Sequence, residues 1–134
     1  MTKTLDTKLK IGSWDEKSIQ EFDDGSKITR ADVTLLNGAD GLDSGSFHSV
    51  MYYRPDGTST YTTVMRLTGT LDGRSGSIVL IGDGNYNGAT AMGRLQLVDG
   101  SATGELVGIT GHAESDSTHG EYPFMPISLT YDLP

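Results

Sequence analysis

The sequence contains no cysteine. This absence excludes disulfide bonds, thiolate nucleophiles and cysteine metal ligands, so the folded chain must be stabilised by packing and hydrogen bonding. Long apolar runs are also missing, since no stretch approaches the roughly 18 consecutive apolar residues of a transmembrane helix. Residues 1–10 carry scattered charges where a secretory signal needs an apolar run. We therefore expect a soluble, cytoplasmic protein.

Positive charge is scarce. Lysine and arginine number 10 against 18 aspartate and glutamate, which gives a formal net charge of -8. The average field of such a protein repels polyanions. We therefore expect neither nucleic acid nor an anionic membrane surface as a partner.

A helical period is missing as well. No window sustains an apolar period of 3.6 residues, and the longest candidate for a helical turn, residues 15–22, is short and mostly charged. Instead, short runs rich in threonine, valine, leucine, isoleucine and tyrosine alternate apolar with polar residues, and the 18 glycines fall between and within them. An alternation of period two predicts half-buried β-strands with very little helix.

Turn sequences separate these runs. Arg54-Pro55-Asp56-Gly57 and Asp72-Gly73 are strong hairpin signals, and we interpret residues 82–85 and 99–100 as turns too. Residues 103–111 predict a tight turn without strand structure, and residues 114–120 predict a polar loop. About eight strands are expected, covering residues 5–14, 28–37, 41–54, 58–68, 74–81, 86–98, a short stretch after 111, and 127–133.

Consecutive hairpins without crossover helices favour an antiparallel, up-and-down strand order, and closing such a sheet removes its exposed edges. We therefore predict an all-β protein: residues 1–134 form one domain, a single closed antiparallel barrel of about eight strands. A barrel of this size encloses a space that side chains can fill or that can hold one small ligand. Its interior is the first place to look for a functional site.

Four motifs occur in order along the chain, at residues 13–16 (Ser-Trp-Asp-Glu), 72–77, 100–108 and 122–131. In these motifs, and over nearly its whole length, the chain resembles a bacterial family catalogued as domain of unknown function 3224. The resemblance implies a barrel similar to those of the allene oxide cyclases and the dirigent proteins, which guide the cyclisation or coupling of small apolar molecules. Such an analogy concerns the fold and assigns no reaction.

The chain departs from the family pattern at three positions. Met65 stands where the resemblance implies a glutamate, Ile78 where phenylalanine is usual, and Ala102 where glycine is usual. The missing carboxylate at position 65 counts against any shared acid-base reaction that needs it.

Histidines and carboxylates gather near the C-terminus, at His112, Glu114, Asp116, His119 and Glu121. These are metal-ligating residue types. However, residues 114–120 have the composition of an exposed loop, where such side chains are common, and the paired histidines of a cupin site are absent. The glycines also lack the spacing of a phosphate-binding loop. We expect no metal and no other cofactor.

Several single residues are candidates for the wall or mouth of the interior. Adjacent Tyr52 and Tyr53 point to opposite faces of a strand, so one can line a cavity. Arg66, if it faced inward, would need an acidic partner or an anionic ligand. Glu105 lies in a shared motif, although holding a turn is its more common role. The candidate ligand-binding residues are Trp14, Tyr52, Arg66, Glu105 and His112.

Three functions compete. The leading hypothesis is that the barrel binds a small, partly apolar molecule in its interior. The second is a cyclase- or isomerase-like lyase, in which the same cavity positions an intermediate and one glutamate or histidine moves a proton. The third is a filled barrel that acts through its exterior, as a homo-oligomer or an interaction module. Two convergent titratable groups within hydrogen-bond reach would distinguish an enzyme from a binding protein.

Overall fold

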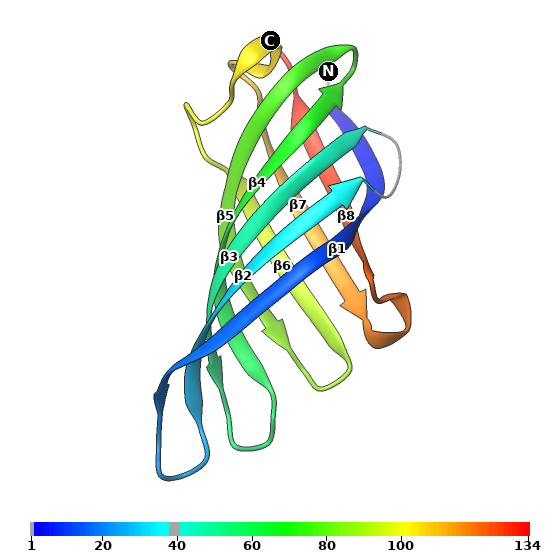
Figure 1. Ribbon diagram of the computed structural model, residues 1–134. Helices are drawn as coiled ribbons and strands as arrows, with labels where there is room; N and C mark the ends of the chain where they lie inside the picture. The colour runs from blue at the N-terminus through cyan, green and yellow to red at the C-terminus, as the bar shows by residue number, and fades with distance from the viewer. Residues whose placement is uncertain (1, 38–40) are drawn as a thin grey trace.

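The computed structural model describes residues 2–37 and 41–134. Its strands form one closed ring in sequence order, in which every strand is antiparallel to its neighbours and the last strand pairs with the first (Figure 1). Within the described residues, no helix is long and apolar enough to cross a membrane. The elements are β1 (Thr2–Glu21), β2 (Lys27–Asn37), β3 (Leu42–Tyr53), β4 (Ser59–Leu71), β5 (Arg74–Tyr86), β6 (Thr90–Leu97), the short 3-10 helix η1 (Gly104–Leu106), β7 (Thr110–Thr118), the 3-10 helix η2 (His119–Glu121) and β8 (Phe124–Asp132).

The predicted fold class, an all-β closed antiparallel barrel of eight strands, is confirmed. Both strong hairpin signals are turns. The β3–β4 turn is closed by a 3.0 Å hydrogen bond from the Gly57 amide to the Arg54 carbonyl. Asp72 and Gly73 join β4 to β5 with φ values of 54° and 78°, the left-handed conformation that a two-residue hairpin loop requires.

The first strand is longer than predicted. β1 continues to Glu21 through the segment considered for a helical turn. Its pairing with β2 shifts register between Ile11 and Ser13, and again between Ser18 and Gln20. Each such bulge adds one residue and reverses which positions face inward. The alternation is therefore interrupted, which concealed the continuous strand.

The predicted loop at 114–120 is also wrong for most of its length. Strand β7 extends to Thr118. The half-buried residues Ser115 and Ser117 alternate with the exposed Glu114 and Asp116. Because the inward positions carry serine rather than apolar side chains, the alternation of hydrophobicity is lost and the sequence resembles a loop.

The predicted turn at residues 82–85 is a third correction, because these residues lie inside β5. A Cβ atom at Gly82 would overlap the carbonyl oxygen of Arg94, and one at Gly84 would overlap the Tyr61 ring. The two glycines permit a close approach between neighbouring strands and form no turn. The chain reverses instead at residues 87–89, between β5 and β6.

The two ends of the barrel differ. Near the end that carries the chain termini in Figure 1, the side chains of Leu35, Leu67 and Ile78 fill the interior and are almost fully buried. The connection between β6 and β7 packs there too, with Leu106 and Ile109 buried. The opposite end is formed by the β1–β2, β3–β4, β5–β6 and β7–β8 connections, and it holds the cavity described next.

Candidate functional site

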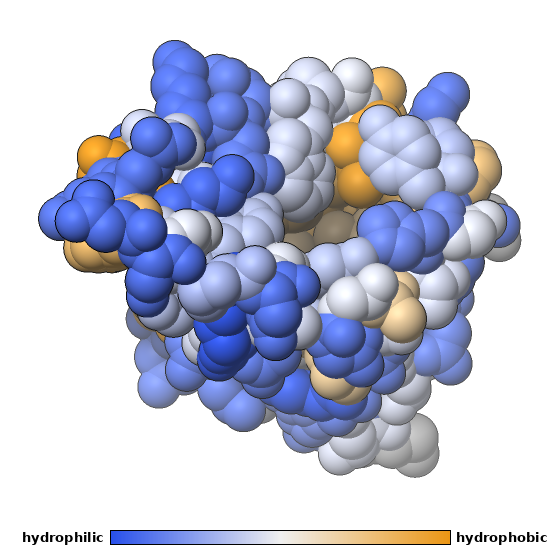
Figure 2. Space-filling model, turned by 90° about the horizontal axis from the view of Figure 1, so that it is seen from below, coloured by the Kyte–Doolittle hydropathy of each residue, from blue (hydrophilic) through white to orange (hydrophobic). Residues whose placement is uncertain are grey.

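The barrel contains a cavity of about 380 Å³. Seen from the hairpin end, the surface is hollowed near its centre, and a largely polar rim surrounds less polar residues deeper in (Figure 2). Most of the wall is apolar. Side chains from β1 and from β3 to β8 line it, including Ile11, Trp14, Phe47, Met51, Tyr53, Tyr61, Met65, Tyr86, Leu95, Phe124 and Met125.

The cavity exists because small residues occupy inward positions of β6 and β7. Ala91 and Gly93 on β6, and Ser115 and Ser117 on β7, all line it. Further along β6, Leu97 is buried and fills the same side of the barrel. Protein interiors are close-packed where side chains are large enough to meet. Four small residues in neighbouring strands therefore leave space that the other side chains do not fill.

The β3–β4 wall can be followed from the mouth inward through its cross-strand pairs. It carries aromatic, sulfur-containing and hydroxyl side chains. In order from the hairpin, the pairs are Tyr53 with Ser59, Met51 with Tyr61, Ser49 with Thr63, and Phe47 with Met65. All eight residues line the cavity.

A carboxylate at the mouth gathers three hydrogen-bond donors. Trp14 Nε1 donates to Glu16 Oε1 over 2.9 Å, while the hydroxyls of Tyr53 and Thr29 donate to Glu16 Oε2 over 2.8 and 2.9 Å. The bulge after Ile11 places Trp14 and Glu16 on the inner side of the strand. These three hydrogen bonds hold the Glu16 carboxylate in one position.

Trp14 also forms part of the cavity wall. Its ring meets the ring of Phe47 edge to face, with centroids 5.9 Å apart, an arrangement that aromatic pairs favour. Nevertheless, 47% of Trp14 remains exposed. The indole can therefore contact a molecule that enters the cavity.

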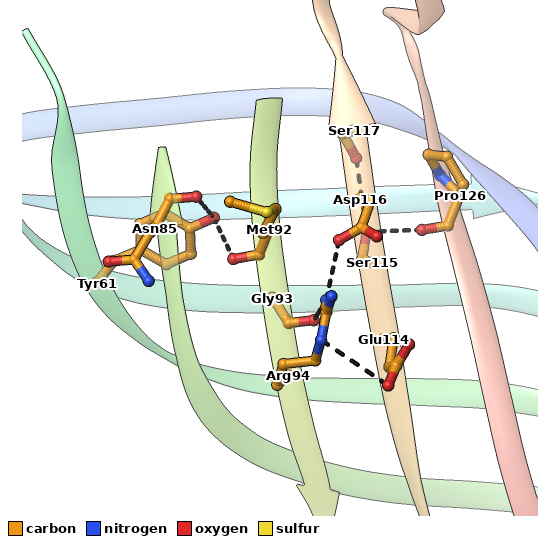
Figure 3. A network of polar contacts seen from close by, with 10 residues as sticks. All are labelled: Tyr61, Asn85, Met92, Gly93, Arg94, Glu114, Ser115, Asp116, Ser117 and Pro126. Carbon is orange, nitrogen blue, oxygen red and sulfur yellow. Dashed lines mark hydrogen bonds and ion pairs between the residues drawn. The ribbon is translucent and has the colours of Figure 1, made fainter. Parts of the chain in front are cut away.

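Two phenols of the wall keep their protons at neutral pH. Burial, and then the hydrogen bond to the Glu16 carboxylate, raise the pKa of Tyr53 well above its usual value. Burial, followed by the charge of Asp116, raises the pKa of Tyr61 to about 12. The Tyr61 hydroxyl lies 3.2 Å from the Met92 carbonyl oxygen, to which it donates (Figure 3). Both groups are therefore hydrogen-bond donors and not bases.

The carboxylates of β7 are engaged outside the cavity. Arg94 on β6 donates from Nη1 to Asp116 over 2.9 Å, and its Nε lies 3.8 Å from Glu114 (Figure 3). His119 instead hydrogen bonds to the Tyr86 hydroxyl at the rim. Among residues 2–37 and 41–134, no three histidine, aspartate or glutamate side chains converge as a metal site would require.

Of the five sequence candidates, the structure brings Trp14 to the cavity. Tyr52, Arg66 and His112 have exposed side chains on the outer face of their strands. The inward member of the tyrosine pair is Tyr53. Alternation predicted that one of the two would face inward, but it could not decide which.

The remaining candidates have structural contacts. Arg66 donates from Nη2 to the Ser77 hydroxyl over 3.1 Å on the outer face, so it meets no buried anion. Glu105 is in η1, where its carboxylate accepts a 3.2 Å hydrogen bond from the Ser75 amide. Neither side chain lines the cavity.

Sequence reasoning missed Glu16 and the hydroxyl pair Ser49 and Thr63. Glu16 stands two residues after Trp14, so period two would have placed both on one face of the strand. The serine and threonine carried no comparable signal, because hydroxyl residues are ordinary components of strands.

The comparisons concern family and fold. A family model described as a protein of unknown function, DUF3224, matches residues 6–131. The crystal structure of a protein of unknown function from the same family, from Shewanella oneidensis MR-1, is similar with a TM-score of 0.70 and 18% sequence identity, over 98% of this chain and 99% of that one. At this identity the likeness concerns the fold alone. No curated protein matches the chain.

Proposed function

Since the chain belongs to the DUF3224 family, which carries no assigned activity, we propose from the geometry that the protein binds a small, partly apolar molecule in its barrel cavity. The carrying observation is the cavity of about 380 Å³ with a mostly apolar wall and an opening at the hairpin end. Small-molecule sites are usually concave and mostly apolar, with volumes of roughly 300–1,000 Å³. Transfer of apolar ligand surface from water into this space would drive binding.

The other two hypotheses have less support. The open cavity argues against a filled barrel. Self-association through the exterior stays a prediction, but a filled interior no longer supports it. A cyclase- or isomerase-like enzyme needs a proton-transfer group free to reach its substrate. Glu16 already accepts three hydrogen bonds, and Met65 occupies the position where the family resemblance implied a glutamate.

One observation favours the enzyme as a second candidate. Tyr86 and His119 hydrogen bond to each other and both line the cavity at its rim. If this pair transfers a proton, turnover of a bound compound would be lost in His119→Gln while binding persisted. The likeness to allene oxide cyclases stays a prediction within this candidate.

Binding can be measured with the protein's single tryptophan, because Trp14 lies in the wall. Titration with N-phenylnaphthylamine, an uncharged apolar dye, should quench Trp14 and increase dye emission. Gly93→Val should weaken dye binding by narrowing the cavity. Gln96→Val, on the exposed face of the same strand, is the matched control and should bind as the wild type does.

Native mass spectrometry of freshly purified protein gives a second readout. A co-purified small molecule that disappears from Gly93→Val would support the proposal. Absence of dye binding to the wild-type protein, or equal dye affinity in Gly93→Val and the wild type, would overturn it.

A further inference from the structure

The cavity wall contains a pair of buried hydroxyl groups at mid-depth. Ser49 on β3 and Thr63 on β4 are cross-strand partners whose side-chain oxygens lie 2.6 Å apart. The two residues are only 2% and 7% exposed, and both line the cavity. Nearer the mouth lie Met51 and Tyr61, and deeper in lie Phe47 and Met65. The pair is therefore a polar position within a largely apolar wall.

One proton of this pair has no acceptor among the residues that the structure describes. Two hydroxyl groups carry two protons, and the bond between Ser49 and Thr63 uses one of them. Neither hydroxyl makes another hydrogen bond to the described residues. Because a buried donor without a partner is costly, the free O–H favours a ligand atom that accepts a hydrogen bond.

The charges around the cavity disfavour an ionised ligand at this depth. No lysine or arginine is among the described residues that line it. Asp83 is the lining residue with a carboxylate. Its side chain is exposed, and it accepts a hydrogen bond from Thr62, whose side chain is on the exposed face of β4. A charge buried without an opposite charge is strongly penalised. The ligand group that meets Ser49 and Thr63 should therefore be uncharged.

On the basis of the proposed function, we infer that the ligand is an uncharged, mainly apolar molecule with one hydroxyl or carbonyl oxygen, which accepts a hydrogen bond from the Ser49–Thr63 pair. The rival ligand is an apolar acid whose carboxylate stays at the rim. Lys27 offers a cation for it near the β3–β4 wall, with its Nζ 5.2 Å from the centre of the Tyr53 ring. Comparing matched head groups distinguishes the two.

The experiment is displacement of N-phenylnaphthylamine by undecanone (the methyl ketone), undecanol and undecanoate, each kept below the concentration at which it self-associates. These compounds have the same chain length and differ in the head group. We expect the ketone and the alcohol to displace the dye at concentrations roughly tenfold lower than the carboxylate. Tighter binding of undecanoate, or equal binding of all three, would overturn the inference.

Variants then test the hydroxyl pair itself. Ser49→Ala combined with Thr63→Val should weaken ketone binding roughly fivefold, the loss of one hydrogen bond, and leave dye affinity unchanged. Thr62→Val, the exposed neighbour on β4, is the control. If the double variant does not fold, the head-group comparison on the wild-type protein remains the test of the ligand class. Unchanged ketone affinity contradicts the ligand class alone, whereas failure of the dye to bind the wild type contradicts the proposed function as well.

Discussion

The hydroxyl of Tyr53 donates a 2.8 Å hydrogen bond to Oε2 of Glu16, from β3 to β1 across the mouth of the barrel. The strand β2 lies between these two strands in the sheet. The contact therefore connects strands that share no backbone ladder, and it holds the extended part of β1 against the cavity. Trp14 and Thr29 donate to the same carboxylate.

Removing this hydroxyl should destabilise the protein. In Tyr53→Phe, the free energy of unfolding should fall by about 1 kcal/mol, because one hydrogen bond to a partly buried carboxylate is lost. Urea denaturation monitored by Trp14 fluorescence measures the change. Tyr52→Phe is the control, since the Tyr52 side chain is exposed, and its effect should stay within about 0.5 kcal/mol. Equal effects of the two substitutions would contradict the role assigned to Tyr53.

The elevated pKa of Tyr61 predicts a loss of stability in alkali. Burial raises this pKa to about 12, above the roughly 10 of an unfolded tyrosine. The folded state therefore holds its proton more tightly, and the contribution of Tyr61 is complete below about pH 10 and declines as pH rises towards 12. Denaturation at about pH 9 and about pH 11 should give a smaller difference for Tyr61→Phe than for the wild type. An identical pH dependence would show that Tyr61 titrates normally.

Glycines within the strands should differ sharply in their tolerance of a methyl group. Gly82→Ala should destabilise the barrel by about 3 kcal/mol, because the new Cβ would overlap the rigid backbone carbonyl of Arg94. Gly93→Ala is the matched control, since its nearest neighbour would be the Ser115 carbonyl oxygen at 3.9 Å. Thermal unfolding followed by circular dichroism compares them. A Gly82→Ala melting temperature equal to that of Gly93→Ala would rule out the close approach of β5 and β6.

The β4–β5 turn isolates the effect of backbone conformation. Gly73 has a φ of 78°, and a Cβ there would meet no atom within 4 Å. Gly73→Ala should therefore cost about 1 kcal/mol through the left-handed conformation alone. Gly120 has equal space without a left-handed φ, so Gly120→Ala should change stability by less than about 0.5 kcal/mol. Urea unfolding of both variants provides the measurement, and a neutral Gly73→Ala would contradict the turn geometry.

The sequence by itself determined the fold class, the number of strands and the strongest hairpins. These features depend on local physics: alternation selects strands, and Asp72-Gly73 selects a left-handed turn. The local rule failed at Gly82 and at residues 114–118, where the reason for the residue type lies on a neighbouring strand or in the cavity. A pattern of residues within one segment of the sequence cannot reveal such a contact.

Only the tertiary structure decided which faces point inward and where space remains. The bulge after Ile11 reverses the inward positions of β1 and brings Glu16 to Tyr53, which is 37 residues away in the sequence. The cavity depends on small side chains from β6 and β7 lying on the same side of the barrel. Both results follow from the strand register and the closure of the barrel. These depend on many strand pairs together and are not encoded in any one segment.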